Sequence, residues 1–430
     1  MINTLKELVS IDSVCEMGEG GFPYGSGPAK ALDCVLSKAE DLGFRTKNAD
    51  YKYAFAEIGQ GDEIVAVLGH LDVVPAGEGW NTPAFEATEK DGRIYGRGTV
   101  DDKGPTAAAM YAMKDLLDRG KPLNKRVRLI FGQCEEKGDW KDIEAYKANE
   151  ELPCCGFTPD AEFPALYGEK GIVQLEVSTA RAGSGLQEAE GGSAPNVVPG
   201  HCRLVVGGET FEADCVPAHG STPWKGTNAI TLAAEKVRAA GKTSKFVDFY
   251  LDHFGNTHHG ENCGIAFEDE ESGKISVNPG VLRIDGDQVK LSLDIRIPVT
   301  VSSDEVTGRL SETLKPFGAT INIINNLRNV YLPKDGSEMM ALLKAYREVT
   351  GDMSDPIIIG GGTYARGMDN VVAFGPLYPG QENVEHIANE YIGIKHMEEL
   401  REIYYKALCN LLEKKKPRLP RHQGKQGRNS

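Results

Sequence analysis

Histidine and acidic side chains that could bind metal ions recur at four places along the 430-residue chain. The first place is His70, which is followed two residues later by Asp72. Residues two apart on an extended chain face the same side, so one can bind a metal ion while the other supports it. We expect His70 to be the ligand and the Asp72 carboxylate to fix the tautomer of its imidazole ring. By itself, a His-x-Asp pair is a weak signal.

Carboxylates supply the other candidate ligands. Asp101 and Asp102 lie in a glycine-rich turn directly before a predicted helix. A carboxylate there is well placed to bridge two cations, but it could equally cap the helix. Glu135 and Glu136 directly follow a predicted strand. Adjacent carboxylates at a strand end are usually solvated; if they are buried, they need metal ions to offset their repulsion.

The fourth place joins Asp160 to His386, which lies far beyond it in the chain. The fold must therefore bring distant segments together. Open α/β sheets do this just past the carboxyl ends of their strands, where they place ligand sites. We therefore expect all four places to meet at one edge of a sheet.

The elements that must position these residues predict an α/β fold. Strand-like and helix-like stretches alternate up to about residue 178, as in a mostly parallel sheet with crossover helices. Residues 179–330 combine alternating polar and apolar segments with glycine-rich joints, which is typical of a separate α+β domain. The predicted elements are strands at 64–68, 127–131 and 357–359, helices at 107–117 and 339–349, and an alternating segment at 290–296.

The simplest organisation is one α/β domain with a second domain inserted in it. We predict residues 1–178 and 331–412 as the two parts of the α/β domain and 179–330 as the insert. Residues 413–430, rich in lysine and arginine, are predicted to be a disordered basic tail.

The composition excludes several classes of function. The net charge of −15, from 48 basic and 63 acidic side chains, argues against a nucleic-acid partner. No apolar run approaches the ~20 residues that a membrane-spanning helix needs, and the N-terminus lacks the pattern of a signal peptide. Nine cysteines without CxxC pairs fit a reducing compartment. We therefore expect a cytoplasmic protein with no membrane partner, in which Cys154 and Cys155 are buried free thiols.

In this order, the motifs resemble those of the M20 family of metallopeptidases, and within it the PepV-type bacterial dipeptidases, which are Xaa-His or carnosinase-like. The resemblance covers essentially residues 3–412. It is carried by Gly69-His70-Leu71-Asp72-Val73-Val74-Pro75, by Thr158-Pro159-Asp160-Ala161-Glu162-Phe163-Pro164, and by Pro379-Gly380, His386 and Asn389-Glu390-Tyr391-Ile392. It implies a catalytic domain of the zinc-peptidase type, with a mixed, mostly parallel sheet, and an inserted α+β lid domain.

The resemblance also implies two divalent metal ions, with Zn²⁺ preferred and Mn²⁺ or Co²⁺ as alternatives. The implied ligands are His70 and Asp160 for one ion, Glu136 and His386 for the other, and Asp101 as the bridge between them. In related enzymes the peptide bond between Asp101 and Asp102 is cis.

Further residues receive roles from the same resemblance. Glu135 would accept a proton from a water activated between the two cations and pass it to the leaving amine. His219 would donate a hydrogen bond to the developing oxyanion, and Asn196 matches a family position near the substrate. The Arg366 guanidinium could pair with the carboxylate of a peptide.

The residue at position 160 indicates the type of reaction. In this family, aspartate there accompanies aminopeptidases and dipeptidases, whereas glutamate accompanies carboxypeptidases and acyl-amino-acid deacylases. We therefore predict a dipeptidase acting on unblocked dipeptides or short peptides. Asp102, Glu162 and Glu390 are candidates for binding the free amino group of the substrate.

Three other functions are alternatives to this one. An N-acyl-amino-acid deacylase or desuccinylase of the same family is the main alternative, and an inactive metal-dependent binding protein on the same fold is another. An acyl transferase with Cys134 as nucleophile is disfavoured, because the adjacent glutamates would raise the pKa of the thiol. The expected partner is a small peptide substrate, and the expected state is a monomer.

Overall fold

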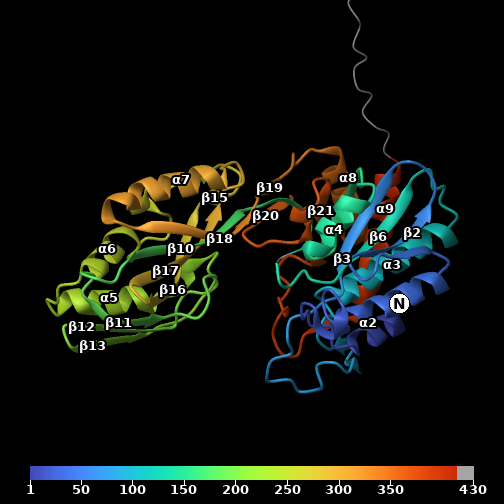
Figure 1. Ribbon diagram of the computed structural model, residues 1–430. Coiled ribbons are helices and arrows are strands. Elements are labelled where there is room, and N and C mark those ends of the chain that lie inside the picture. The colour runs from blue at the N-terminus through green and yellow to red at the C-terminus, as the bar shows by residue number, and fades with distance from the viewer. Residues whose placement is uncertain (139, 414–430) are drawn as a thin grey trace, which may run out of the picture. The chain divides into compact units, whose positions relative to one another are not determined.

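The computed structural model describes residues 1–138 and 140–413 (Figure 1). The predicted basic tail therefore lies outside the described residues, except for Glu413. The chain forms two compact units: unit 1 comprises Met1–Asp160, Met340–Met353 and the described part of Gly380–Ser430, and unit 2 comprises Ala161–Met339 and Ser354–Pro379. The boundaries of the catalytic and lid domains given above stay a prediction.

Unit 1 contains helices and strands in alternation. Its helices are α1 (Ile2–Val9), α2 (Ser26–Asp41), α3 (Lys103–Asp118), α4 (Lys141–Asn149), α8 (Ser337–Thr350, whose first residues belong to unit 2) and α9 (Ile394–Leu412). Its strands are β1 (Arg45–Asn48), β2 (Ala54–Gly59), β3 (Ile64–His70), β4 (Thr88–Lys90), β5 (Arg93–Tyr95), β6 (Arg126–Gly132), β7 (Cys155–Thr158) and β23 (Tyr391–Gly393).

The main sheet of unit 1 has a buried centre. Its strands in this unit follow the order β1-β2-β6-β3-β7. All seven residues of β3 are buried, which is the pattern of a strand covered on both faces. Helix α3 packs against β3 and α9, and Figure 1 shows these helices with the strands. The predicted strands at 64–68 and 127–131 are confirmed within β3 and β6, and the predicted helix at 107–117 within α3.

The direction of the strands decides where the candidate ligands lie. β3 pairs in parallel with both β6 and β7, whereas β2 pairs antiparallel with β1 and with β6. The predicted α/β fold class is confirmed, with a mixed sheet. Because β6, β3 and β7 run in the same direction, the residues that follow them emerge at one edge. Glu135, His70 and Asp160 lie at or just beyond these three ends.

Unit 2 is an α+β structure. Its helices are α5 (Ala229–Ala239), α6 (Lys245–His253) and α7 (Ser303–Leu314). Its strands are β8 (Ala161–Glu162), β9 (Leu166–Glu169), β10 (Gly171–Ala180), β11 (Leu186–Gly191), β12 (His201–Val206), β13 (Glu209–Asp214), β14 (Glu268–Asp269), β15 (Gly273–Lys274), β16 (Ser276–Asp285), β17 (Gln288–Ile297), β18 (Thr320–Leu327), β19 (Val330–Tyr331), β20 (Ile357–Ile359), β21 (Val371–Ala373) and β22 (Pro376–Leu377).

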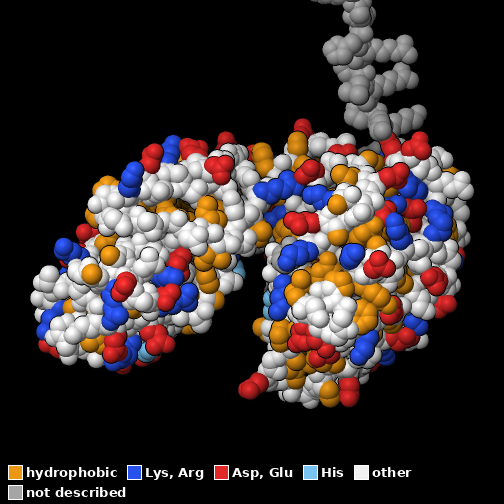
Figure 2. Space-filling view, in the orientation of Figure 1, with side chains coloured by type: hydrophobic (Ala, Val, Ile, Leu, Met, Phe, Trp, Pro, Cys, Tyr) orange, Lys and Arg blue, Asp and Glu red, His pale blue; other side chains and the backbone are white. Residues whose placement is uncertain are grey.

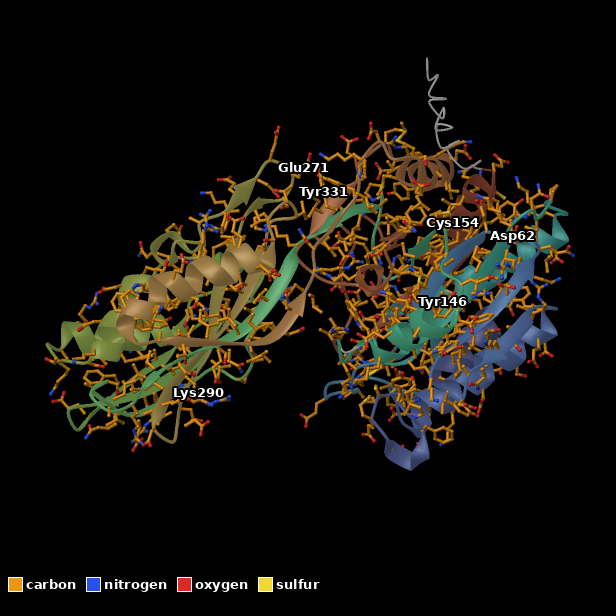
Figure 3. The ribbon with its side chains drawn as sticks, turned by 45° about the horizontal axis from the view of Figure 1, so that its top comes forward. Asp62, Tyr146, Cys154, Glu271, Lys290 and Tyr331 are labelled. Carbon is orange, nitrogen blue, oxygen red and sulfur yellow. The ribbon has the colours of Figure 1, made fainter. Side chains whose placement is uncertain are left out.

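A seven-stranded antiparallel sheet, in the order β13-β12-β11-β16-β17-β10-β18, dominates unit 2. In β17, Leu291, Leu293 and Ile295 alternate with polar residues and enter one core cluster with α5, α6 and α7. The helices therefore cover one face of the sheet (Figure 1). The opposite face carries the polar residues of β17, from Lys290, labelled in Figure 3, to Arg296. The predicted alternation at 290–296 is confirmed.

The remaining expectations about the chain are mostly met. The predicted helix at 339–349 lies within α8, and the predicted strand at 357–359 is β20. None of the nine cysteines forms a disulfide, but Cys154, which immediately precedes β7, is exposed rather than buried as predicted. Among the described residues, no helix combines the length and the apolar character needed to cross a membrane.

A buried ion pair crosses strands β2 and β6. Glu57 and Arg128 lie opposite each other in the register, and the Arg128 Nε donates to the Glu57 Oε2 at 2.8 Å. Both side chains are buried, and the Arg128 guanidinium also donates to the hydroxyl of Tyr146 on α4, labelled in Figure 3. The pair therefore joins two strands and a helix of unit 1.

Replacing Glu57 by glutamine is expected to destabilise the protein by about 3–5 kcal/mol, because losing the buried partner of Arg128 leaves only the more distant Glu150, 3.7 Å away, to compensate this charge. Urea unfolding followed by circular dichroism measures this change. The exposed pair of Arg309 and Glu305 on α7 is the control, and Glu305→Gln should cost less than about 1 kcal/mol. Equal effects of the two substitutions would contradict the role given to the buried pair.

Candidate metal centre

His70 is the last residue of β3, and its side chain is completely buried. Its Nδ1 donates to the backbone carbonyl of Asp72 at 3.0 Å, so Nε2 would carry the lone pair once the ring gives up its second proton to bind a cation. Nε2 lies 2.9 Å from the Asp101 Oδ1. Two acceptors cannot face each other at this distance without a proton or a cation between them. The ring is therefore oriented as a metal ligand requires.

Glycine at position 69 allows α3 to approach this strand. A Cβ atom on Gly69 would lie 2.0 Å from the Thr106 Oγ1 and 3.0 Å from the Asp102 Oδ2. The Asp102 carboxylate accepts hydrogen bonds from the backbone N–H of His70 and from the Thr106 hydroxyl. The first turn of α3 is thus fixed against the end of β3, with Asp101 directly before it.

Asp72 contacts both His70 and the segment that carries Glu135 and Glu136. Its carboxylate oxygens each accept one backbone N–H, from Glu135 and from Glu136, both at 3.1 Å. The contact with the imidazole is made by the carbonyl of Asp72, while its carboxylate lies 3.5 Å from the His70 Nδ1. We expected the carboxylate to orient the ring; in the structure it mainly fixes the turn after β6.

Asp101 lies between the two histidines. Its Oδ1 is 2.9 Å from the His70 Nε2, and its Oδ2 is 2.8 Å from the His386 Nε2. One carboxylate that faces two ligand nitrogens in this way has the geometry of a bridge between two cations. The peptide bond between Asp101 and Asp102 is cis, as the family resemblance described above implies.

The other candidate ligands complete the cluster. The His386 Nε2 lies 3.1 Å from the Glu136 Oε2, and the His70 Nε2 lies 3.9 Å from the Asp160 Oδ2. Among the described residues, two groups have ligand atoms within 4.8 Å of one another: His70, Asp101 and Glu136, and His70, Glu135 and Asp160. The structure thus brings all five predicted ligands and Glu135 together, while the division of the ligands between two ions stays a prediction.

The charges of the cluster fit divalent cations. Burial and the neighbouring Asp101 raise the pKa of Glu136 to about 7, and burial with Asp160 raises the pKa of Glu135 well above its ordinary value. Hydrogen bonds to Asp101 and Glu136 raise the pKa of His386 to about 11. Four crowded carboxylates therefore demand positive charge, and oxygen and imidazole donors suit Zn²⁺, Mn²⁺ or Co²⁺.

The three acids considered for the substrate amino group lie in different surroundings. Asp102 and Glu390 are completely buried and accept hydrogen bonds from the protein itself. Glu162 is exposed on β8 in unit 2. Neither buried acid is accessible to a substrate in this structure.

His219 and Asn196 lie on neighbouring segments of unit 2. The backbone N–H of Gly220 donates to the Asn196 carbonyl at 2.7 Å, and Val197 forms an antiparallel bridge with His219. The Ser221 backbone N–H donates to the His219 Nδ1 at 3.2 Å. Partial desolvation and the charge of Arg296 lower the pKa of His219. The ring is therefore neutral near pH 7, with its proton on Nε2.

Arg366 is placed differently from what we expected. Its guanidinium is 3% exposed and donates to the Glu169 carboxylate and to the carbonyls of Lys170, Gly361 and Arg328. A substrate carboxylate would have to displace Glu169, so the predicted substrate contact gains no support and stays a prediction.

Arg296 is not among the predicted site residues, although its position in the alternating pattern of β17 places it on the polar face of the sheet. Its guanidinium pairs with Asp294 at 2.6 Å and donates to the Gly360 carbonyl. It also acts electrostatically on His219. The alternation of polar and apolar residues along β17 is the feature of the sequence that could have identified Arg296.

Cys134 has the environment of a structural thiol. Its side chain is buried, and its Sγ lies 2.8 Å from the Sγ of Cys15. The contact with Cys15 and burial raise the pKa of Cys134 far above the ordinary value. A nucleophilic cysteine needs the opposite shift.

Metal binding is expected to release more protons at pH 6 than at pH 8. Glu136 must lose its proton to bind a cation, and its pKa rises from 4.5 to about 7 in the metal-free fold. This raised pKa stabilises the metal-free fold fully below about pH 4.5, and the contribution is lost as the pH rises through about 7. The apparent metal affinity, which already falls with decreasing pH because His386 must lose its proton, should therefore fall more steeply below pH 7. Calorimetric titration in buffers of different ionisation enthalpy counts the protons, and equal release at both pH values would contradict the expectation.

Comparison with known proteins identifies the family of this chain. The sequence model "Peptidase family M20/M25/M40" matches residues 66–410. A Staphylococcus haemolyticus protein named "Putative dipeptidase" is 34% identical over 96% of this chain and 97% of its own length.

Solved structures share the fold. An M20 family metallo-carboxypeptidase from Sulfolobus solfataricus covers 96% of this chain and 99% of its own, with a TM-score of 0.61 and 18% identity. A dinuclear metal-binding peptidase of the M20 family from Bacillus subtilis covers 96% of this chain and 97% of its own, with a TM-score of 0.55 and 13% identity. The chain described here belongs to peptidase family M20 and is a hydrolase that acts on peptide bonds.

Proposed function

We propose that this peptidase is a dipeptidase that hydrolyses unblocked dipeptides or short peptides with two divalent metal ions, Zn²⁺ being preferred. The observation that carries the proposal is the Asp101 carboxylate, whose two oxygens face the His70 and His386 nitrogens at 2.9 and 2.8 Å. His70 and Asp160 would hold one ion, and Glu136 and His386 the other. When bound, the ions polarise the scissile carbonyl and lower the pKa of a water between them.

Glu135 is the proposed general base. Its side chain lies in the group with His70 and Asp160, and its backbone is fixed by the Asp72 carboxylate. Burial and Asp160 raise its pKa, and a raised pKa makes the carboxylate a stronger base. It would take a proton from the attacking water and deliver it to the nitrogen of the leaving amine.

His219 is the proposed donor to the oxyanion. Because its Nδ1 accepts the Ser221 N–H, its Nε2 carries the proton and can donate it as a hydrogen bond. The lowered pKa keeps the ring neutral, so the donor does not depend on protonation near pH 7. Asn196 is retained as a substrate contact because its segment pairs with that of His219.

The chemistry of the expected partner follows from the charges and the relatives. The net charge of −15 and the mixture of acidic and basic side chains over the face in Figure 2 favour a small peptide over nucleic acid. The Staphylococcus relative carries the word dipeptidase in its name, and the aspartate at position 160 favours the same reaction. A cytoplasmic monomer remains our proposal for the state in the cell.

The proposal predicts that the protein, stripped with EDTA and reloaded with Zn²⁺ or Mn²⁺, hydrolyses a free dipeptide but not its N-acetylated twin. Release of free amino acid, measured by chromatography, gives the rates. Glu135→Gln should lower kcat by about 10²- to 10⁴-fold, because it removes the base. It should retain the metal ions, because Glu135 is not a proposed ligand.

The exposed Glu151, which pairs with Arg126, provides a matched control, and Glu151→Gln should leave kcat unchanged. Cleavage of the acetylated substrate alone would replace the proposal by a deacylase. Tightly bound metal with turnover of neither substrate would indicate a binding protein instead.

A further inference from the structure

Two loops that carry metal-binding candidates start from the same pair of strands. Strands β5 and β23 pair antiparallel, with Tyr95 opposite Tyr391. In an antiparallel pair, the residues after one strand lie beside the residues before the other. The loop that leads to Asp101 follows β5, and the segment with His386 precedes β23. The backbone N–H of Gly96 donates to the carbonyl of Glu390 at 3.0 Å and extends the pairing into the loops.

The carboxylate of Glu390 organises the loop before Asp101. Its Oε1 accepts the backbone N–H of Val100 at 2.9 Å and of Asp101 at 3.3 Å. Its Oε2 accepts the N–H of Gly98 at 3.1 Å and a guanidinium N–H of Arg97 at 2.7 Å. The side chain is completely buried, so these donors replace the water that a carboxylate would otherwise need.

Arg97 connects the same carboxylate to a third loop. Its guanidinium is 2% exposed, and it donates toward the carbonyls of Pro75 and Ala76, which follow the His70 strand, at 3.4 and 3.3 Å. It also donates toward the carbonyl of Ile387, next to His386, at 3.4 Å. The ion pair of Arg97 and Glu390 thus touches all three segments that bear His70, Asp101 and His386.

The segment before Glu390 is held in an unusual backbone conformation. His386 and Asn389 have φ angles of 62° and 65°, which residues other than glycine rarely adopt. The Asn389 side chain accepts the Asn81 backbone N–H at 2.7 Å and donates to the Gly79 carbonyl at 3.1 Å. The surrounding contacts therefore have to keep His386 in place.

We propose that Glu390 is a positioning residue of the metal centre: with Arg97, it holds the Asp101 loop at the distance from His386 that a bridging carboxylate requires. This inference rests on the proposed two-metal function. The Glu390 carboxylate is buried and contacts protein groups, so it would act on the metal ions through the Asp101 loop. Four N–H groups converge on the two carboxylate oxygens, so position 390 needs a side chain that accepts hydrogen bonds and donates none. In a glutamine, the amide nitrogen would be a donor that faces other N–H donors.

The test compares Glu390→Gln with Glu57→Gln. Both substitutions remove a buried carboxylate that faces an arginine in unit 1, but Glu57 lies on β2 and pairs with Arg128, away from the ligand loops. Zn²⁺ affinity, measured by competition with a chromogenic chelator, should weaken by about 10- to 100-fold in Glu390→Gln and stay at the wild-type value in Glu57→Gln. The visible absorption of bound Co²⁺ should change only in Glu390→Gln, while both variants lower the melting temperature.

The outcomes separate this inference from the function it rests on. Wild-type affinity and Co²⁺ spectrum in Glu390→Gln, or equal losses in both variants, would overturn the positioning role and leave the proposed function standing. A wild-type protein that binds no metal ion would overturn both. If Glu390→Gln does not fold, Arg97→Lys keeps the charge but loses the forked donor. It should weaken Zn²⁺ binding in the same direction, and an unchanged affinity would overturn the proposal.

Discussion

Like charges held in contact are the constraint on which the rest of unit 1 depends. Asp101, Glu135, Glu136 and Asp160 surround two histidines at one edge of the sheet, where partial burial limits the screening of their charges by water. Such a cluster is unfavourable for a protein that uses it only for stability. Divalent cations turn the repulsion into coordination, so the same arrangement that costs folding free energy creates a place for metal ions.

The fold meets this constraint with carboxylates that are not themselves proposed ligands. Asp72 accepts the backbone N–H groups of Glu135 and Glu136, and Glu390 accepts those of the loop that ends at Asp101. In both cases a carboxylate fixes main chain, and the main chain aims the side chains that face the cations. Parallel pairing of β3 with β6 and β7 then brings the separate segments to one edge.

The sequence predicted the α/β class, the main strands and the residues of the cluster, because apolar runs and ordered motifs are local signals. It could not predict which atoms make the contacts. We expected the Asp72 carboxylate to orient the imidazole of His70, but the backbone carbonyl of Asp72 makes the hydrogen bond to the ring. Glu390 was a candidate for substrate binding, and Arg366 for a substrate carboxylate, yet both are buried against protein groups. Burial of a charged side chain depends on long-range packing, which spacing along the chain does not reveal.

The measurement that tests the central claim most directly is anomalous diffraction from crystals grown with Zn²⁺, recorded at the absorption edge of the metal. We predict two peaks, both at about 2.0–2.2 Å from oxygens of Asp101. The ion at one peak should also be coordinated by the His70 Nε2, and the ion at the other peak by the His386 Nε2. A single peak, or ions bound away from Asp101, would contradict the account of a carboxylate-bridged pair of metal ions.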